Sequence, residues 1–185
     1  DPIAVVDRMG KDRKYDIRKS VRNGAVLIDT PSIAQVREYY CLLRNLYNKK
    51  VHTPLWSLHF FETLYQSGQA HFLLVGCSDK IVGGVVCVSL CDRVVYEWYA
   101  CGDDENNSHI SPSIMATYWG LCFAAERGIP RFDLMGAGQP GIPYGVRDFK
   151  ARFGGQLVEY GRFRCVCNPI RYKLGSLGVK LLKRL

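Results

Sequence analysis

A single stretch near the C-terminus, residues 128–161, most constrains how this chain can fold. Residues 131–135 alternate charged and apolar side chains and are followed by Gly136, Gly138 and Gly141. Alternation of this kind predicts a half-buried strand, and glycine permits backbone conformations that are closed to other residues. The pattern therefore predicts a strand that ends in an open, glycine-lined loop.

Lys150 lies on a short segment that follows this loop. Apolar residues recur at spacings of three and four over residues 146–153, which predicts a helical turn anchored by its two phenylalanines. Arg147, Lys150 and Arg152 fall on the other sides of this turn. A cation at the rim of a glycine-lined opening favours an anionic substrate, because its charge is ordered before the ligand arrives. A solvated lysine with ion-paired arginines beside it is the alternative interpretation.

The remaining segments predict an α/β fold with a mixed and partly antiparallel sheet. Helices are expected over residues 7–23, 30–48, 54–66 and 111–127, and strands over residues 25–29, 72–77, 81–91, 94–101 and 156–166. Ser111 and Pro112 are expected to supply the cap and the first turn of the last of these helices. A chain of 185 residues suits one domain. We divide it into a basic N-terminal helix (1–24), a core (25–167) and a basic C-terminal helix (168–185).

Positive charge gathers at both ends of the chain, whose formal net charge is +8. The basic residues of the C-terminal end include Lys180, Lys183 and Arg184. Anionic partners are therefore favoured, namely RNA, phosphorylated sugars or anionic lipid headgroups. Lys14 and Arg18, on the N-terminal helix, are candidate contacts to phosphates. A solvated surface, or packing of this helix on a missing half of the protein, is the alternative.

The cysteines and histidines give no sign of a metal site or a disulfide framework. Five of the eight cysteines lie inside or beside apolar segments, where a thiol behaves as a small hydrophobe, and this favours a reducing compartment. Cys165 and Cys167 form a lone C-x-C, and the four histidines match no ligand spacing. We expect no metal and no cofactor. With no leader after Asp1 and no apolar run of membrane-spanning length, we expect a cytoplasmic protein.

Four motifs give the chain a family resemblance. GIPRFDLMG and FKARFGG lie within residues 128–155, VVYEWYACG lies at residues 94–102, and RKYDIRKSVRNG lies at residues 13–24. These segments resemble the Fem-type peptidoglycan peptidyltransferases, with Ser20 where that family has alanine. The resemblance covers most of the chain in patches and is strongest after Val94. It implies an acyltransferase fold of the GNAT type, and it implies that the chain is mainly the second of two such halves, with an N-terminal half-domain outside it.

The same resemblance implies roles for residues around the glycine loop. Lys150 matches the lysine that the family associates with a phosphate-bearing substrate, and its charge would also stabilise the acyl centre. Asp133 matches the family's Asp or Asn before the loop, where a carboxylate orients a nucleophilic amine or bonds loop amides. Tyr96 and Tyr99 lie on the matching strand, where a phenol can bond a carbonyl or a departing ribose oxygen. Strand alternation lets only one of them face the opening directly, and core packing is the alternative for either. The expected catalytic set is Lys150, Tyr99 and Asp133, and the expected substrate-binding set is Tyr96, Arg147, Arg152, Gly136, Gly138, Arg18 and Lys14.

The function that this resemblance implies is transfer of an amino acid from aminoacyl-tRNA to an amine of a UDP- or lipid-linked peptidoglycan precursor. The ester donor is already activated, so that positioning suffices and no protein nucleophile or paired carboxylate base is expected. Such a protein would work in the cytoplasm, with peripheral contact to the inner membrane.

Two other functions stay open. An acyl-CoA N-acyltransferase usually carries a Q/R-x-x-G-x-G/A turn whose amides hold the pyrophosphate. Residues 100–113 contain one glycine, Gly102, and are acidic at Asp103, Asp104 and Glu105. This composition disfavours coenzyme A and leaves another thioester open. A half-domain that binds anionic partners without catalysis is the third possibility.

Overall fold

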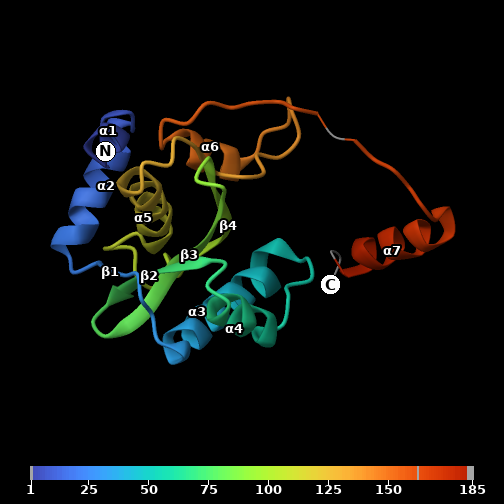
Figure 1. Ribbon diagram of the computed structural model, residues 1–185, viewed down its shortest axis with the longest axis horizontal. Coiled ribbons are helices and arrows are strands. Elements are labelled where there is room, and N and C mark those ends of the chain that lie inside the picture. Colours follow the sequence, from blue (N-terminus) through green and yellow to red (C-terminus); the bar gives the residue numbers. More distant parts are fainter. Residues whose placement is uncertain (1, 162, 183–185) are drawn as a thin grey trace.

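A mixed sheet of five strands forms the centre of the computed structural model, which describes residues 2–161 and 163–182 (Figure 1). The strands are β1 (Val26–Ile28), β2 (His71–Cys77), β3 (Lys80–Leu90), β4 (Val94–Gly102) and β5 (Phe132–Asp133), and they lie in that order across the sheet. Neighbours pair antiparallel from β1 to β4, whereas β4 and β5 pair parallel. The expected α/β fold with a mixed and partly antiparallel sheet is therefore confirmed, and three of the four strand pairings are antiparallel.

Helices cover both faces of this sheet, and each face has its own apolar cluster (Figure 1). One face carries α1 (Pro2–Asp7), α2 (Lys11–Arg22) and α5 (Pro112–Glu126), and the other carries α3 (Ile33–Leu46), the π-helix η1 (Tyr47–Val51) and α4 (Leu58–Gln66). After β5 come α6 (Gly145–Ala151) and α7 (Pro169–Leu182). The sheet is thus the middle of three layers.

The middle strands β2 and β3 are apolar almost without interruption. Residues 72–77 and 81–87 are all buried, as expected for strands covered on both faces. Gly84 shows how closely the layers approach, because a Cβ there would lie 2.7 Å from a methyl of Leu74 and 3.1 Å from the ring of Tyr39. Glycine at this position therefore lets α3 pack directly on β3.

Strands β4 and β5 run side by side only briefly. Their ladder consists of the pairs Val95–Phe132 and Tyr96–Asp133, and β4 then continues to Gly102 without β5 beside it. A β-bulge places Trp98 outside the register with β3, and bulges re-aim the side chains next to them. The carboxyl half of β4 is therefore open toward the loop that follows β5.

The N-terminal helix expected over residues 7–23 is interrupted. Helix α1 ends at Asp7 and α2 begins at Lys11. Between them Gly10 is extended, and its N–H donates to the carbonyl of Arg152 at 3.2 Å. This long-range bond anchors the chain to the end of α6 and so separates the two helices.

Two further elements are shorter than expected. The helix expected from Pro54 begins at Leu58, where Ser57 provides the N-terminal cap. The strand expected over residues 131–135 is reduced to β5. Its end is set by Asp133, whose carboxylate accepts the amide of Met135 at 2.7 Å and turns the chain away from the sheet.

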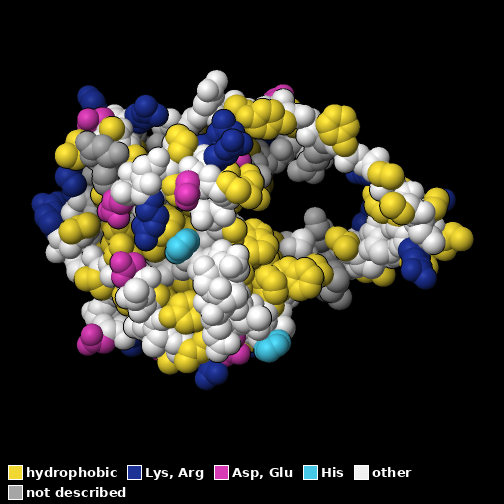
Figure 2. Space-filling view, viewed as in Figure 1, with side chains coloured by type: hydrophobic (Ala, Val, Ile, Leu, Met, Phe, Trp, Pro, Cys, Tyr) yellow, Lys and Arg dark blue, Asp and Glu magenta, His cyan; other side chains and the backbone are white. Residues whose placement is uncertain are grey.

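The strand expected over residues 156–166 is wrong for the part of it that the structure describes. Residues 156–161 and 163–166 are exposed and have no regular secondary structure. A strand requires a neighbour that satisfies its backbone N–H and C=O groups. Here the segment leads away from the sheet to α7, and Figure 2 shows open space between the body and this arm.

The C-terminal helix expected over residues 168–185 is described as α7, from Pro169 to Leu182. Lys183 and Arg184 lie outside the described residues, as does Asp1. Apolar side chains of α7 such as Ile170, at 73% exposure, face solvent. Among the helices that the structure describes, none is both long and apolar enough to cross a bilayer.

Candidate active site

A cleft of about 470 Å³ lies where β4 parts from β5. Parallel strands present their carboxyl ends at the same edge of a sheet, where ligands of open α/β sheets commonly bind. The lining residues come from α3 and η1, the second half of β4, the start of α5, the loop after β5, and α6. The polar side chains among them are those of Tyr47, Glu97, Tyr99, Asp104, Ser113, Thr117 and Lys150.

Glu97 is a buried carboxylate in this cleft. It comes from β4 and is 6% exposed, and the hydroxyl of Thr117 on α5 donates to its Oε1 at 2.6 Å. Burial raises the pKa of Glu97 to about 7, although the Thr117 hydrogen bond and the ammonium of Lys150 act in the opposite direction. Burial of a carboxyl disfavours its charged form. Glu97 is therefore poised to gain and lose a proton near neutral pH.

Lys150 enters the same cleft from α6, close enough to Glu97 for their charges to interact. Its ammonium donates to the carbonyl of Leu134 and, at 2.9 Å, to that of Gly136. Burial lowers the pKa of Lys150, and the carboxylates of Glu97 and Asp133 partly offset this effect. An ammonium has three N–H donors, so two carbonyls fix its position and one donor remains for a ligand.

The glycine loop between β5 and α6 is held by Arg147. Its guanidinium donates to the carbonyls of Ala137, Gln139 and Ile142. These bonds tie the loop to the same helix that carries Lys150. The loop and the lysine are therefore positioned together.

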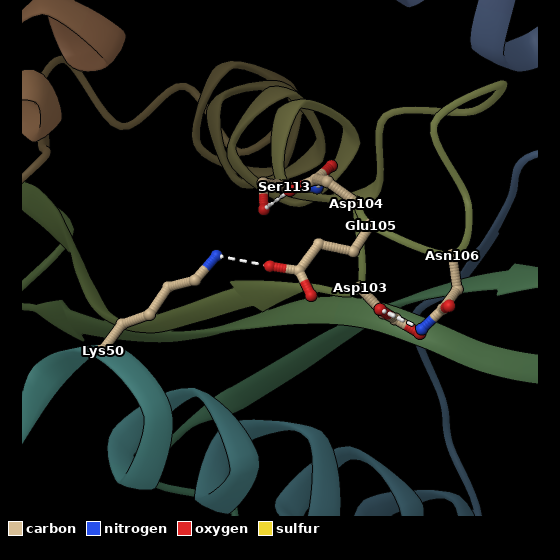
Figure 3. A network of polar contacts seen from close by, with 6 residues as sticks. All are labelled: Lys50, Asp103, Asp104, Glu105, Asn106 and Ser113. Carbon is tan, nitrogen blue, oxygen red and sulfur yellow. Dashed lines mark hydrogen bonds and ion pairs between the residues drawn. The ribbon is translucent and has the colours of Figure 1, made fainter.

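The start of α5 forms the far wall of the cleft. Figure 3 shows the side chains of Asp104 and Ser113 pointing toward one another there. The carboxylate of Asp104 accepts the backbone N–H of Ser113 at 3.1 Å and also accepts the Ser113 hydroxyl. Glu105 forms an exposed ion pair with Lys50 at 2.9 Å. The sequence predicted that Ser111 caps this helix, but its side chain makes no cap hydrogen bond, and Asp104 takes that role instead.

The structure brings three of the predicted site residues together. Lys150, Tyr99 and Gly136 all line the cleft. Tyr99 is fixed through its backbone carbonyl, which accepts the buried Tyr39 hydroxyl at 3.0 Å, and burial raises the pKa of its phenol. A phenol in this state stays protonated and can donate a hydrogen bond at neutral pH.

Other predicted residues support the cleft from outside it. Tyr96 and Asp133 face each other across the β4–β5 ladder and are not among the lining residues. The carboxylate of Asp133 bonds the amide of Met135, which is the structural one of its two expected roles. Gly138, at a φ of +75°, packs against Tyr144 in the loop that Arg147 holds.

The remaining predicted residues lie away from this cleft. Arg152 lines a second, smaller cavity of about 320 Å³ together with the buried Arg13. Lys14 donates to the carbonyl of Asp7 at 3.1 Å, and Arg18 is exposed on α2. Neither Lys14 nor Arg18 lines either cavity.

Glu97 is the site residue that the sequence reasoning missed. No paired carboxylate was expected, because no second acid stands near Asp133 in the sequence. The available signal was different: Glu97 is the one carboxylate within the apolar segment VVYEWYACG. A charged residue inside a buried strand requires a partner or a function.

Side chains that commonly bind metals are scattered over the described part of the chain. Residues 2–161 and 163–182 contain no group of three or more His, Cys, Asp or Glu side chains placed to hold an ion. All eight cysteines are free. Buried thiols such as Cys101, whose pKa burial raises to about 12, remain protonated.

The chain matches a family model described as an acetyltransferase (GNAT) domain over residues 11–151. This protein belongs to that GNAT domain family. The matched residues run from α2 to the end of α6, so that the sheet and the cleft of this GNAT domain both fall within them. The expected GNAT-type fold is thereby confirmed. A comparison with curated proteins found no match.

Solved structures share the fold of this GNAT domain at low sequence identity. An aminoglycoside acetyltransferase from an uncultured soil metagenomic sample, in complex with sisomicin, has a TM-score of 0.62 at 12% identity, over 80% of this chain and 99% of that one. FemX has a TM-score of 0.67 at 11% identity, over 83% of this chain and 56% of FemX. The ribosomal-protein-alanine N-acetyltransferase of Brucella melitensis biovar Abortus 2308 has a TM-score of 0.55 at 15% identity, over 77% and 99%.

Proposed function

We propose that this GNAT domain transfers an amino acid from aminoacyl-tRNA to an amine of a UDP- or lipid-linked peptidoglycan precursor. The observation that carries the proposal is Glu97, a buried carboxylate with a pKa of about 7 that lines the cleft beside Lys150. A general base works best when its pKa lies near the operating pH. The choice of donor and acceptor is supported by the motifs that resemble Fem-type peptidyltransferases and by the fold shared with FemX.

The acceptor amine must lose its charge before it can attack. It arrives as an ammonium, and one of its protons passes to the carboxylate of Glu97. The neutral nitrogen then attacks the ester carbonyl carbon, so that a C–N bond forms and the C–O bond to ribose breaks. A second N–H proton ends on the departing ribose oxygen. Glu97 releases its own proton to water and is ready for another cycle.

Lys150 and Tyr99 act on the donor in this scheme. The free N–H of the Lys150 ammonium stabilises negative charge that develops on the carbonyl oxygen, which is a large effect in a partly buried site. The Tyr99 phenol donates to the ribose oxygen as it departs. Because the ester is already activated, alignment of the two reactants supplies the rest of the acceleration.

The test is a transfer assay with a labelled amino acid on tRNA and a UDP-linked muropeptide. We expect label in the muropeptide with the native chain and a loss of at least about 100-fold with Lys150→Ala. Lys80→Ala, an exposed lysine at the start of β3 that lines neither cavity, is the matched control and should leave the rate unchanged. Turnover by a folded Lys150→Ala protein at the native rate would remove Lys150 from the mechanism, and a native chain without transfer would refute the donor and acceptor.

A second candidate is N-acyl transfer from an acyl-CoA thioester. The family description and the acetyltransferases among the structural neighbours favour it. Glu97 would serve the acceptor amine in the same way, since deprotonation of an amine does not depend on the donor. The two candidates therefore differ in how the donor is held.

A further inference from the structure

The first turn of α5 decides whether a phosphate can be held in this cleft. Backbone N–H groups at the start of a helix have no partner within the helix and, with the positive end of the helix dipole, attract phosphates. In this chain Pro112 has no N–H group to offer. The next residue, Ser113, gives its N–H to Asp104 Oδ1 at 3.1 Å and its hydroxyl to the other carboxylate oxygen.

The remaining amides of this turn are also used. The N–H groups of Ile114 and Met115 both donate to the carbonyl of Ser111, at 3.0 Å and 3.1 Å. Ser111 takes a left-handed conformation, with a φ of +41°. Each backbone donor from Pro112 to Met115 is therefore absent or already satisfied within the chain.

Space at the turn is closed as well. A Cβ at Gly102, the last residue of β4, would collide with the backbone nitrogen of Ser113 and would lie 2.8 Å from the carbonyl carbon of Pro112. The end of β4 thus lies directly against the start of α5. Because Asp104 and Ser113 line both the cleft and the second cavity, a ligand that reaches this turn must displace their contact.

The neighbouring acids of this loop have partners of their own. Asp103 and Glu105 flank Asp104 in the chain, but of the three only Asp104 lines the cleft, and the other two point toward Asn106 and Lys50 (Figure 3). Lys50 pairs with Glu105, and Asn106 donates to both carboxylate oxygens of Asp103 at 2.9 Å. The half-buried Asn107 also donates to the carboxylate of Asp103. The outer two acids are therefore bound by other residues, and Asp104 is the one of the three that bonds the helix.

We propose that the carboxylate of Asp104 is a built-in anion at the start of α5 and that it excludes the pyrophosphate of a coenzyme A thioester. This GNAT domain then takes its acyl group from an ester donor held elsewhere in the cleft. The choice of an ester donor rests on the proposed function. The residues at this turn do not fit coenzyme A, because the donors that would cradle its pyrophosphate already bind a carboxylate. Asp104 is therefore a specificity-determining residue.

The experiment measures binding of coenzyme A itself by calorimetry. NMR spectra of the backbone amides follow the Ser113 N–H during the same titration. The native chain should show no saturable binding at millimolar coenzyme A and no shift of the Ser113 amide. Asp104→Ala frees the Ser113 N–H and hydroxyl. It should bind coenzyme A saturably, at least tenfold more tightly than the millimolar limit that applies to the native chain. Asp103→Ala removes the same charge from the same loop without touching α5, and it should behave as the native chain.

Two results would overturn the proposal. One is saturable binding of coenzyme A by the native chain with a shift of the Ser113 amide, a measurement that needs no variant. The other is an Asp104→Ala protein, folded by circular dichroism, whose affinity equals that of Asp103→Ala. If Asp104→Ala does not fold, Asp104→Asn removes the charge while keeping an acceptor for the Ser113 N–H, and it should still gain affinity. Transfer from the aminoacyl ester is measured in a separate assay. A chain that does not use this ester can therefore be distinguished from a chain that binds coenzyme A in spite of Asp104.

Discussion

Burial moves the pKa values of two residues in the cleft in opposite directions. The pKa of Glu97 rises to about 7 and that of Lys150 falls, because each loses water around its charged form. Their mutual attraction restores part of the charge on both. The result is a carboxylate that can exchange protons at neutral pH next to a cation whose position is fixed by two carbonyls.

Glu97→Gln should abolish proton transfer while keeping the shape of the side chain. We expect kcat/KM to fall by roughly 10² to 10⁴, the usual contribution of a general base. With the native chain, the rate should rise with pH through about 7, the pKa of Glu97, and this inflection should be missing from the residual rate of the variant. Glu126→Gln, an exposed acid on α5, is the control. A variant that keeps the inflection would show that another group is the base.

The same residue should make stability depend on pH. The pKa of Glu97 is raised in the folded chain, from its ordinary value of 4.5 to about 7, so the folded state binds more protons than the unfolded state between these values. The free energy of unfolding should therefore fall as pH rises from about 4.5 to 7, by about 3 kcal/mol at 1.36 kcal/mol per pKa unit. Urea unfolding at pH 5 and pH 8 measures the difference.

Glu97→Gln is the reference for that measurement, since its side chain does not titrate. Groups that do not interact with Glu97 contribute equally to both proteins, so the difference between the two pH profiles isolates Glu97 and its coupling to Lys150. Parallel profiles would mean that the carboxyl is not desolvated in solution. The free energy of unfolding of the variant, measured relative to that of the native chain, should also be higher at pH 8 than at pH 5.

Three elements create the cleft by where they end. β5 stops at Asp133, the bulge at Trp98 turns β4, and α5 begins against Gly102. The end of β5 is set locally, by the bond between Asp133 and Met135. The bulge and the start of α5 depend on other elements, namely β3 beside β4 and the contact of α5 with Gly102.

Gly102→Ala tests the contact between β4 and α5. The added Cβ would meet backbone atoms of Ser113 and Pro112, which cannot move aside as a side chain can. We expect a loss of about 1–3 kcal/mol in the free energy of unfolding, as for other overpacked sites. Gly145→Ala is the matched control, because a Cβ there meets no atom within 4 Å. Equal denaturation midpoints for the two variants would refute the close approach.

The whole molecule consists of a three-layer body and a C-terminal arm. Both apolar clusters lie within the body, up to Phe153. Beyond it, the described part of residues 155–167 is exposed and ends in α7, which Figure 1 shows apart from the sheet. Contact with the inner membrane and with an N-terminal half-domain stay predictions, as does the division of the chain at residues 24 and 167.

Limited proteolysis should distinguish the body from the arm. Trypsin should cut first within the exposed connection, for example after Arg164, because no strand pairing protects it. The N-terminal fragment should keep the circular dichroism and thermal transition of the native chain. First cleavage within β2–β4, or unfolding of the body once the arm is removed, would show that the arm is integral to the core.

Local pattern accounts for much of the fold. Continuous apolar runs predicted β2 and β3, and the alternation before Gly136 with the phenylalanine spacing around Lys150 predicted the loop and α6. These features depend on neighbours within a few residues. The prediction of a strand over residues 156–166 was wrong because it also relied on local pattern alone. The pattern suits a strand, but a strand needs a neighbour to pair with, and local sequence does not specify that neighbour.

The sequence by itself determined the α/β class, the net positive charge and the presence of a lysine beside a glycine loop, because periodicity and composition are properties of the chain alone. Only the tertiary structure decided that Glu97 shares the cleft with Lys150, which of its two expected roles Asp133 takes, and that Asp104 caps α5. Glu97 and Lys150 are 53 positions apart, and Asp104 and Ser113 are 9 apart, whereas Asp133 bonds Met135 only two positions away. Burial, and with it the pKa of a carboxyl, exists only after the layers have packed.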